Sequence, residues 1–84
     1  MSDREKISVD IYGQKYTLRV TPEEKENVLA IANHVDKIMH KLGDNQSRLD
    51  YRDVAVLAAM NLAEDYFRLQ REYEEILAIV NEER

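Results

Sequence analysis

Two histidines are the residues with the clearest potential for catalysis or metal binding. His34 and His40 are six residues apart, which places them on different faces of a helix. Asp36 and His40 are four residues apart, so they could share a metal ion, but zinc sites need three or four ligands. We therefore interpret these residues as polar groups that face solvent, not as a metal site.

Other motifs of catalysis are also missing from the sequence. Ser2, Ser8 and Ser47 have no neighbouring histidine that would activate a nucleophile. Gly13 and Gly43 are isolated, so no glycine-rich loop is present to bind a phosphate. The absence of cysteine excludes disulfides and thiolate metal sites. We expect no enzymatic activity and no cofactor.

Charge and hydropathy exclude two further classes of function. Twelve basic residues oppose seventeen acidic ones, and the formal charge of −5 argues against general binding to a phosphate backbone. The longest apolar run, residues 54–60, is far shorter than the roughly 18 residues that a membrane span needs. The charged residues at the start are not followed by the hydrophobic stretch of a signal peptide. We expect a cytoplasmic protein that does not bind nucleic acid or insert into membranes.

A β-hairpin is predicted over residues 6–20. Apolar and polar residues alternate on both sides of Gly13, with the period of strands that bury one face. A two-residue Gly13-Gln14 turn of type II′ would join these strands, because glycine accepts a positive φ. The register that follows pairs Ile11 with Tyr16, Val9 with Leu18 and Ile7 with Val20, all on one face. A lone hairpin is at best marginally stable in water, so this one must pack on another element.

Three basic residues and one tyrosine could form a binding patch on the head. The predicted register puts Tyr12 on the polar face beside Lys15, and exposed aromatics with basic neighbours are common in binding patches. Arg48 and Arg52 flank the start of the second helix and could extend the patch. Ordinary surface residues are the alternative interpretation.

A first helix is predicted over residues 22–42. Thr21 and Glu24 can form a capping box, and Pro22 suits the first helical position. Gly43 would end the helix in a left-handed conformation. One apolar stripe runs along this helix through Val28, Ile31, Val35, Ile38 and Leu42.

A second, much longer helix follows the polar connection at residues 43–50. Asp50 can cap it, with Asp53 three positions later, and no glycine or proline occurs after that. A helix of about 33 residues is roughly 50 Å long, so the small head cannot cover it and the helix must project. Its first part, residues 54–60, is apolar on all sides, which predicts burial in the head beneath the hairpin.

The rest of the long helix carries a heptad repeat. We refer to its core positions as the seam, namely Leu62, Tyr66, Leu69, Tyr73, Ile76 and Val80. A lone heptad helix exposes its seam, so a partner helix is expected. Leu77 and Ile79 widen the apolar face and favour more than two helices, as in a tetramer, unless they contact only the head. The predicted fold is α+β and mostly helical, with a hairpin-and-helix head and an oligomeric coiled coil.

Several short motifs, in this order, resemble the ZapA family of cell-division proteins. These motifs are Ile11-Tyr12-Gly13, Tyr16-Thr17-Leu18, Thr21-Pro22-Glu23 and Val56-Leu57-Ala58-Ala59-Met60-Asn61-Leu62-Ala63. The resemblance covers nearly the whole chain, although Met60 and Leu62 stand where Leu and Ile are usual. It implies a head at residues 1–61 and an oligomerisation helix at residues 62–84.

The resemblance also implies a function that composition cannot supply. ZapA proteins bind FtsZ, the tubulin-like GTPase of the division ring, and bundle its filaments at midcell as dimers that pair into tetramers. The position after the turn glycine, often basic in relatives, is Gln14 here. We therefore take as candidate FtsZ contacts Tyr12, Lys15, Arg19, Arg48 and Arg52. A generic coiled-coil adaptor with another protein client is the alternative.

Overall fold

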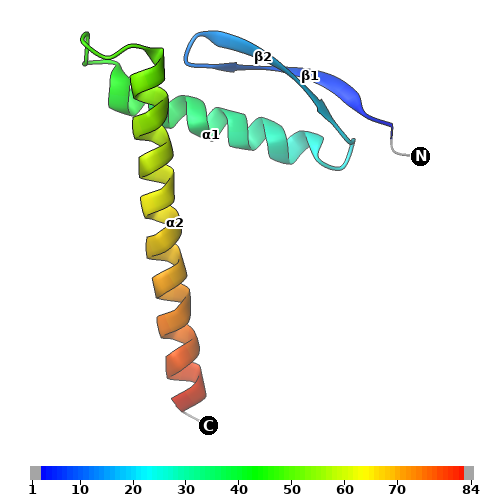
Figure 1. Ribbon diagram of the computed structural model, residues 1–84. Coiled ribbons are helices and arrows are strands. Elements are labelled where there is room, and N and C mark those ends of the chain that lie inside the picture. The colour runs from blue at the N-terminus through cyan, green and yellow to red at the C-terminus, as the bar shows by residue number, and fades with distance from the viewer. Residues whose placement is uncertain (1–2, 83–84) are drawn as a thin grey trace.

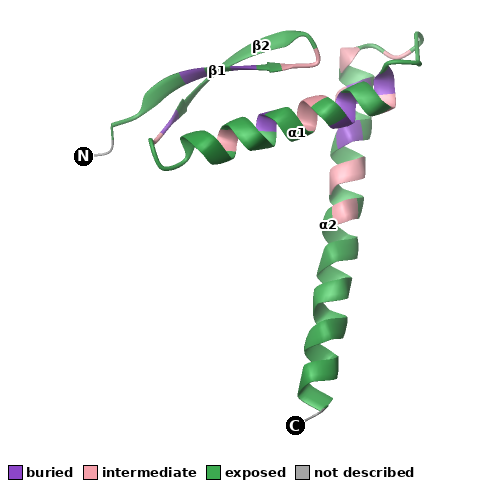
Figure 2. Cartoon of the chain, turned by 180° about the vertical axis from the view of Figure 1, so that it is seen from behind, coloured by how far each residue is buried: buried purple, intermediate pink, exposed green. Residues whose placement is uncertain are grey.

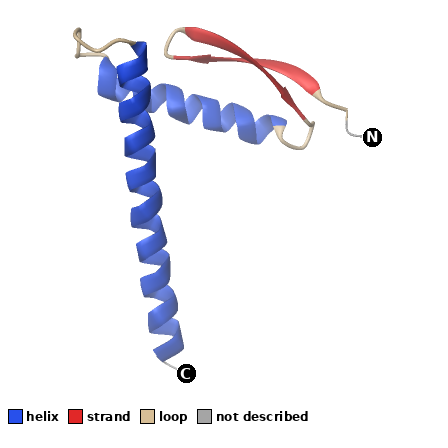
Figure 3. Cartoon of the chain, in the orientation of Figure 1, coloured by secondary structure: helices blue, strands red, loops and turns tan. Residues whose placement is uncertain are grey.

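The computed structural model describes residues 3–82, and these form one hairpin followed by two helices. The elements are β1 (Glu5–Ile11), β2 (Gln14–Val20), α1 (Lys25–Gly43) and α2 (Tyr51–Glu82) (Figures 1 and 3). This architecture confirms the predicted α+β, mainly helical fold. Within the described residues, no helix is both long enough and apolar enough to cross a membrane.

The molecule is a thin, L-shaped object. The hairpin lies along α1 and forms one arm with it, while α2 is the other arm and carries the C-terminus away from the head (Figure 1). The extents of 51, 46 and 14 Å show that the L is hardly thicker than one layer of elements. Among residues 3–82, buried side chains occur only in the hairpin, in α1 and in the upper part of α2, as Figure 2 shows.

The hairpin turn lies one residue earlier than predicted, and the strand pairing is shifted by two residues as a result. Ile11 pairs with Gln14, so the turn is Tyr12-Gly13, and Val9 faces Tyr16 instead of Leu18. Both turn residues have positive φ, 49° and 81°, as a type I′ turn requires. Because the shift is an even number of residues, the apolar side chains keep the predicted common face.

That apolar face is covered mainly along β1, which packs on α1. Ile7, Val9 and Val20 are buried against Ala32 of α1. Leu18, on the same face of β2, remains 40% exposed, since α1 lies under only part of the narrow sheet. The hairpin therefore leaves apolar surface uncovered in the single chain.

The first helix starts later and ends differently than predicted. The capping box does form, because Thr21 N–H donates to Glu24 Oε1 at 2.9 Å and Glu24 N–H donates to Thr21 Oγ1 at 3.3 Å. It encloses a separate turn, however, and α1 begins only at Lys25. The predicted left-handed cap at Gly43 is wrong: Gly43 is the last residue of α1, its φ is not positive, and Asp44 follows in the helical region.

The second helix begins as predicted. Asp53 N–H donates to Asp50 Oδ1 at 2.9 Å, and Asp50 N–H donates to Asp53 Oδ2 at 3.3 Å. The expectation that residues 54–60 lie buried beneath the hairpin is wrong. Val54 is fully buried against α1, whereas Met60 is 66% exposed. One chain covers one side of this segment, so its apolar character on the other sides points to contacts outside the chain.

Candidate functional site

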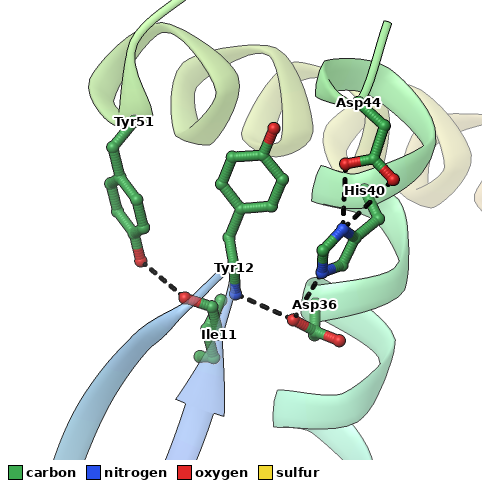
Figure 4. Close-up of polar contacts among 6 residues, drawn as sticks. All are labelled: Ile11, Tyr12, Asp36, His40, Asp44 and Tyr51. Carbon is green, nitrogen blue, oxygen red and sulfur yellow. Dashed lines mark hydrogen bonds and ion pairs between the residues drawn. The ribbon is translucent and has the colours of Figure 1, made fainter.

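The hairpin turn is anchored where the end of α1 meets the start of α2, and we call this region the head corner (Figure 4). Tyr12 N–H donates to Asp36 Oδ1 of α1 at 2.8 Å. From α2, the hydroxyl of Tyr51 donates to the carbonyl of Ile11 at 3.2 Å. The two bonds fix the backbone of the turn to both helices at once.

The side chain of Tyr12 fills the head corner. The prediction that it lies on the polar face of the hairpin is wrong, because it sits in the turn and is half-buried. Its ring meets the His40 ring edge-on at 4.9 Å between centroids. A Cβ on Gly43 would lie 2.5 Å from the Tyr12 hydroxyl and 2.8 Å from Val54 Cγ2. Gly43 is therefore required for close approach of these two side chains, a role that the sequence alone did not reveal.

A second tyrosine pair joins the hairpin to α2. The hydroxyls of Tyr16 and Tyr51 are 2.7 Å apart. Since the single Tyr51 proton goes to the Ile11 carbonyl, the Tyr16 hydroxyl donates to the Tyr51 oxygen. Burial of the Tyr51 phenol is the main cause that raises its pKa to about 12, so the phenol stays neutral and keeps its proton for donation.

His40 takes part in an ion-pair cluster in the last turn of α1, next to the hairpin turn. Its Nδ1 is 2.9 Å from Asp44 Oδ1, and its Nε2 is 3.4 Å from Asp36 Oδ1. The hydrogen bond to Asp44 raises the pKa of His40, and the negative charges of Asp44 and Asp36 act in the same direction, against a smaller opposing effect of burial. No group of three or more residues suited to holding a metal occurs in the described part of the chain. His40 is therefore a polar residue, as predicted, and the structure adds that Asp36 and Asp44 are its partners.

The five candidate contact residues are divided among separate parts of the head. Lys15 lies near the turn end of β2, close in sequence to Tyr12, whereas Arg19 lies at the opposite end of that strand. Arg48 is in the connection between α1 and α2, and Arg52 is in the first turn of α2. In Figures 1 and 2 that connection and the hairpin lie on opposite sides of the top of α2. The five residues therefore do not form a single patch.

The outer face of the hairpin carries the more coherent charge. Cross-strand pairing places Lys15 beside Asp10 and Arg19 beside Lys6. With three basic residues and one acidic residue, this face has a formal charge of +2 on a chain whose total is −5. Such a face is suited to an acidic protein surface.

The seam is exposed along the whole projecting part of α2. Ile76 is 60% exposed, and Figure 2 shows no buried residue in the lower half of this helix. Among the predicted interface residues, Leu62 is half-buried against the head, and the remaining seven are exposed: Tyr66, Leu69, Tyr73, Ile76, Leu77, Ile79 and Val80. A row of large apolar side chains of this length is typical of an interface between proteins.

A second apolar row, which we call the back face, lies on the upper half of α2. It consists of Val56, Met60 and Phe67, which are 54%, 66% and 55% exposed. Helical geometry places these residues opposite Ala58, which is buried against α1. Phe67 was not predicted as a surface residue of this kind. Its spacing of seven residues from Met60 was the available signal, because two helical turns place both residues on one face.

Comparisons with known proteins agree on one family. A family model described as "Cell division protein ZapA" matches residues 7–84. A ZapA protein of Geobacillus sp. (strain WCH70) is 35% identical, with 100% of this chain and 98% of that protein covered. A ZapA protein of Bacillus licheniformis is 37% identical, with 98% of each chain covered. A solved ZapA mutant dimer from Geobacillus stearothermophilus is 32% identical, covers 96% of this chain and 93% of its own, and has a TM-score of 0.69.

Proposed function

Because the chain belongs to the ZapA family of cell division proteins, we propose that it binds FtsZ and cross-links its filaments, and that it stabilises the division ring at midcell in the cytoplasm. The observation that carries this proposal is the exposed seam on a helix that projects from a folded head. A head alone would bind one filament, whereas two heads joined by a rigid bundle would bridge two.

We propose that the projecting helix joins copies of the chain. The structural relative is a dimer, and the exposed seam here offers the matching apolar surface for a second copy. The seam and the back face are separate apolar surfaces on α2, which supports a further pairing of dimers into a tetramer. In this proposal, residues 1–61 act as the head and residues 62–84 as the oligomerisation helix.

Bridging does not require a strong contact from each head. Once one head is attached to a filament, the others are held close to neighbouring filaments, so their attachment is effectively intramolecular. The basic outer face of the hairpin, with Lys15 and Arg19, is the first surface we assign to the contact, because FtsZ is acidic. Tyr12 supports this surface from behind the turn, and Arg48 and Arg52 would provide a second, separate contact.

Sedimentation with FtsZ and GTP tests the proposal. The native chain should increase the FtsZ that pellets at low speed, and it should co-pellet. Lys15→Glu should reduce both quantities, while Lys37→Glu, which makes the same charge change at an exposed position of α1 outside the proposed contact surfaces, should not. If a folded oligomer leaves FtsZ in the supernatant, the adaptor interpretation with another protein client replaces this one.

A further inference from the structure

His40 lies between two carboxylates, and each ring nitrogen faces one of them (Figure 4). Nδ1 is 2.9 Å from Asp44 Oδ1, and Nε2 is 3.4 Å from Asp36 Oδ1. A neutral imidazole has a single N–H and can donate to only one carboxylate, whereas an imidazolium donates to both. The arrangement therefore suits the protonated ring.

Asp36 links this histidine to the hairpin turn. The same Oδ1 atom that faces His40 Nε2 accepts the N–H of Tyr12 at 2.8 Å. The Tyr12 ring also meets the His40 ring at 4.9 Å. Tyr12 has a φ of 49°, a conformation that a large L residue adopts only when its surroundings hold it there. A change at His40 thus acts directly on the contacts that hold a strained residue.

We propose that a proton on His40 controls how firmly the Tyr12 turn is held in the head corner, so that binding of the head to its filament weakens as the pH rises. The second half of this statement rests on the proposed function. When His40 is neutral, Nδ1–H still donates to Asp44, but the lone pair on Nε2 then faces the Asp36 oxygen that holds Tyr12. This repulsion loosens Asp36 and weakens its hydrogen bond with the Tyr12 N–H.

The groups around His40 make it the switch of this cluster. Asp36 and Asp44 face it from α1 and the residue after α1, and Tyr12 faces it from the hairpin. From α2, Tyr51 lies beside the Tyr12 ring, at 6.1 Å between ring centroids, and its pKa of about 12 keeps it neutral. Lys37 and Lys41 adjoin His40 along α1, and neither forms an ion pair with a residue between 3 and 82. Of these groups, only His40 has an ordinary pKa near neutrality.

The direction of the effect follows from the shift in the pKa of His40. The folded protein raises this pKa above its ordinary value of about 6.5, chiefly through the hydrogen bond to Asp44. The folded state therefore binds the proton more tightly than the unfolded chain does. The stabilisation is fully present below about pH 6.5 and is lost as the pH rises through the higher pKa of the folded protein.

An NMR titration of the native chain is the direct test. The His40 ring should titrate above about pH 6.5, and the Tyr12 amide shift should follow the same midpoint. Asp44→Asn removes the charge that contacts His40 without touching Tyr12, so both midpoints should move together to lower pH. A His40 midpoint at or below 6.5, or a Tyr12 amide that does not respond to it, would overturn the proposal.

Two variants separate the proton from mere packing. His40→Gln retains a donor and an acceptor but cannot titrate. The native chain should have a higher melting temperature at about pH 6 than at about pH 8, and His40→Gln should lose this difference. His34→Gln removes the other histidine, which is exposed on α1, and should keep the native pH dependence. Equal pH dependence in the native chain and His40→Gln would contradict the switch.

Pelleting with FtsZ at the same pH values tests the consequence for binding. The ratio of FtsZ pelleted by the native chain to that pelleted by His40→Gln should fall as the pH rises, and this ratio cancels the pH response of FtsZ itself. A ratio that does not change with pH overturns the regulatory half of the proposal. If neither chain pellets FtsZ at any pH, the proposed function fails, while the titration still decides whether His40 holds the turn.

Discussion

The side chains of the head corner pack and form hydrogen bonds within one chain, whereas the seam side chains in the lower half of α2 are exposed. In the corner, the turn, α1 and α2 meet within one chain, and Tyr12, Tyr16 and Tyr51 all have partners. In the lower half of α2, the seam residues face solvent, and Tyr73 has no side-chain hydrogen bond to any residue in the range 3–82. The corner is held by contacts within one chain, whereas the lower half of α2 leaves its apolar side chains exposed, as the proposed pairing with a second copy requires.

The largest expected effect is a charge placed in the seam. Ile76→Asp would bury a carboxylate between helices, at a cost of several kcal/mol per chain, and should dissociate the oligomer. Ala78→Asp introduces the same side chain two positions later, on the side of the helix away from the seam, and should leave the mass unchanged. Sedimentation equilibrium measures the mass, and circular dichroism measures how much of the head stays folded. A stable Ile76→Asp monomer that still bundles FtsZ would contradict the bridging mechanism.

The next effect concerns close packing in the corner. Gly43→Ala gains up to about 1 kcal/mol of helix propensity, but its Cβ would press on Tyr12 and Val54. Overpacking of this kind costs about 1–3 kcal/mol, so we expect net destabilisation in chemical denaturation at fixed protein concentration. The double variant with Tyr12→Phe removes the nearest atom and should recover part of the loss. Stabilisation by Gly43→Ala alone would mean that the corner is looser than the structure shows.

This glycine illustrates what sequence patterns could and could not predict. Period and capping rules identified both strands, both helices and the seam, because these depend on neighbours a few residues apart. The roles of Gly43 and His40 depend on Tyr12, which is about 30 positions away along the chain. The local capping rule gave the wrong result at Gly43, and it could not reveal the contact of His40 with Tyr12. The turn shifted for the same reason: contacts of Tyr12 with α1 hold it at positive φ, although Gly13-Gln14 is the more obvious turn by local preference.

The back face of α2 shows a second limit. Residues 54–60 are apolar on all sides, and the prediction placed all of these sides against the head of the same chain. A single sequence does not distinguish a segment buried in its own fold from one buried against another copy, since both have the same composition. The 66% exposure of Met60 shows that this side of the segment is not buried in its own fold. The candidate FtsZ contacts remain a prediction, because charge on a surface does not name its partner.

A smaller effect is expected from one hydroxyl in each region. Tyr51→Phe removes the donor to the Ile11 carbonyl and the acceptor for Tyr16, and should cost about 1 kcal/mol in the free energy of unfolding. Tyr73→Phe makes the same change in the exposed seam and should be nearly neutral. Chemical denaturation of both variants at one concentration measures the contrast. Equal losses would show that Tyr73 donates to a second copy and is not simply packed against it.

The smallest expected effect is in the charged residues of the lower helix. Arg68 lies 2.9 Å from Asp65 and 3.9 Å from Glu72, at helical spacings of three and four residues, and all three side chains are substantially exposed. Exposed pairs of this kind contribute roughly 0.2–0.5 kcal/mol each, so Arg68→Gln should change the free energy of unfolding by less than about 1 kcal/mol. Added salt should reduce even that difference, because it screens exposed charges. A larger loss that persists in high salt would mean that Arg68 is buried in the assembly, and the interface between copies would then extend beyond the seam.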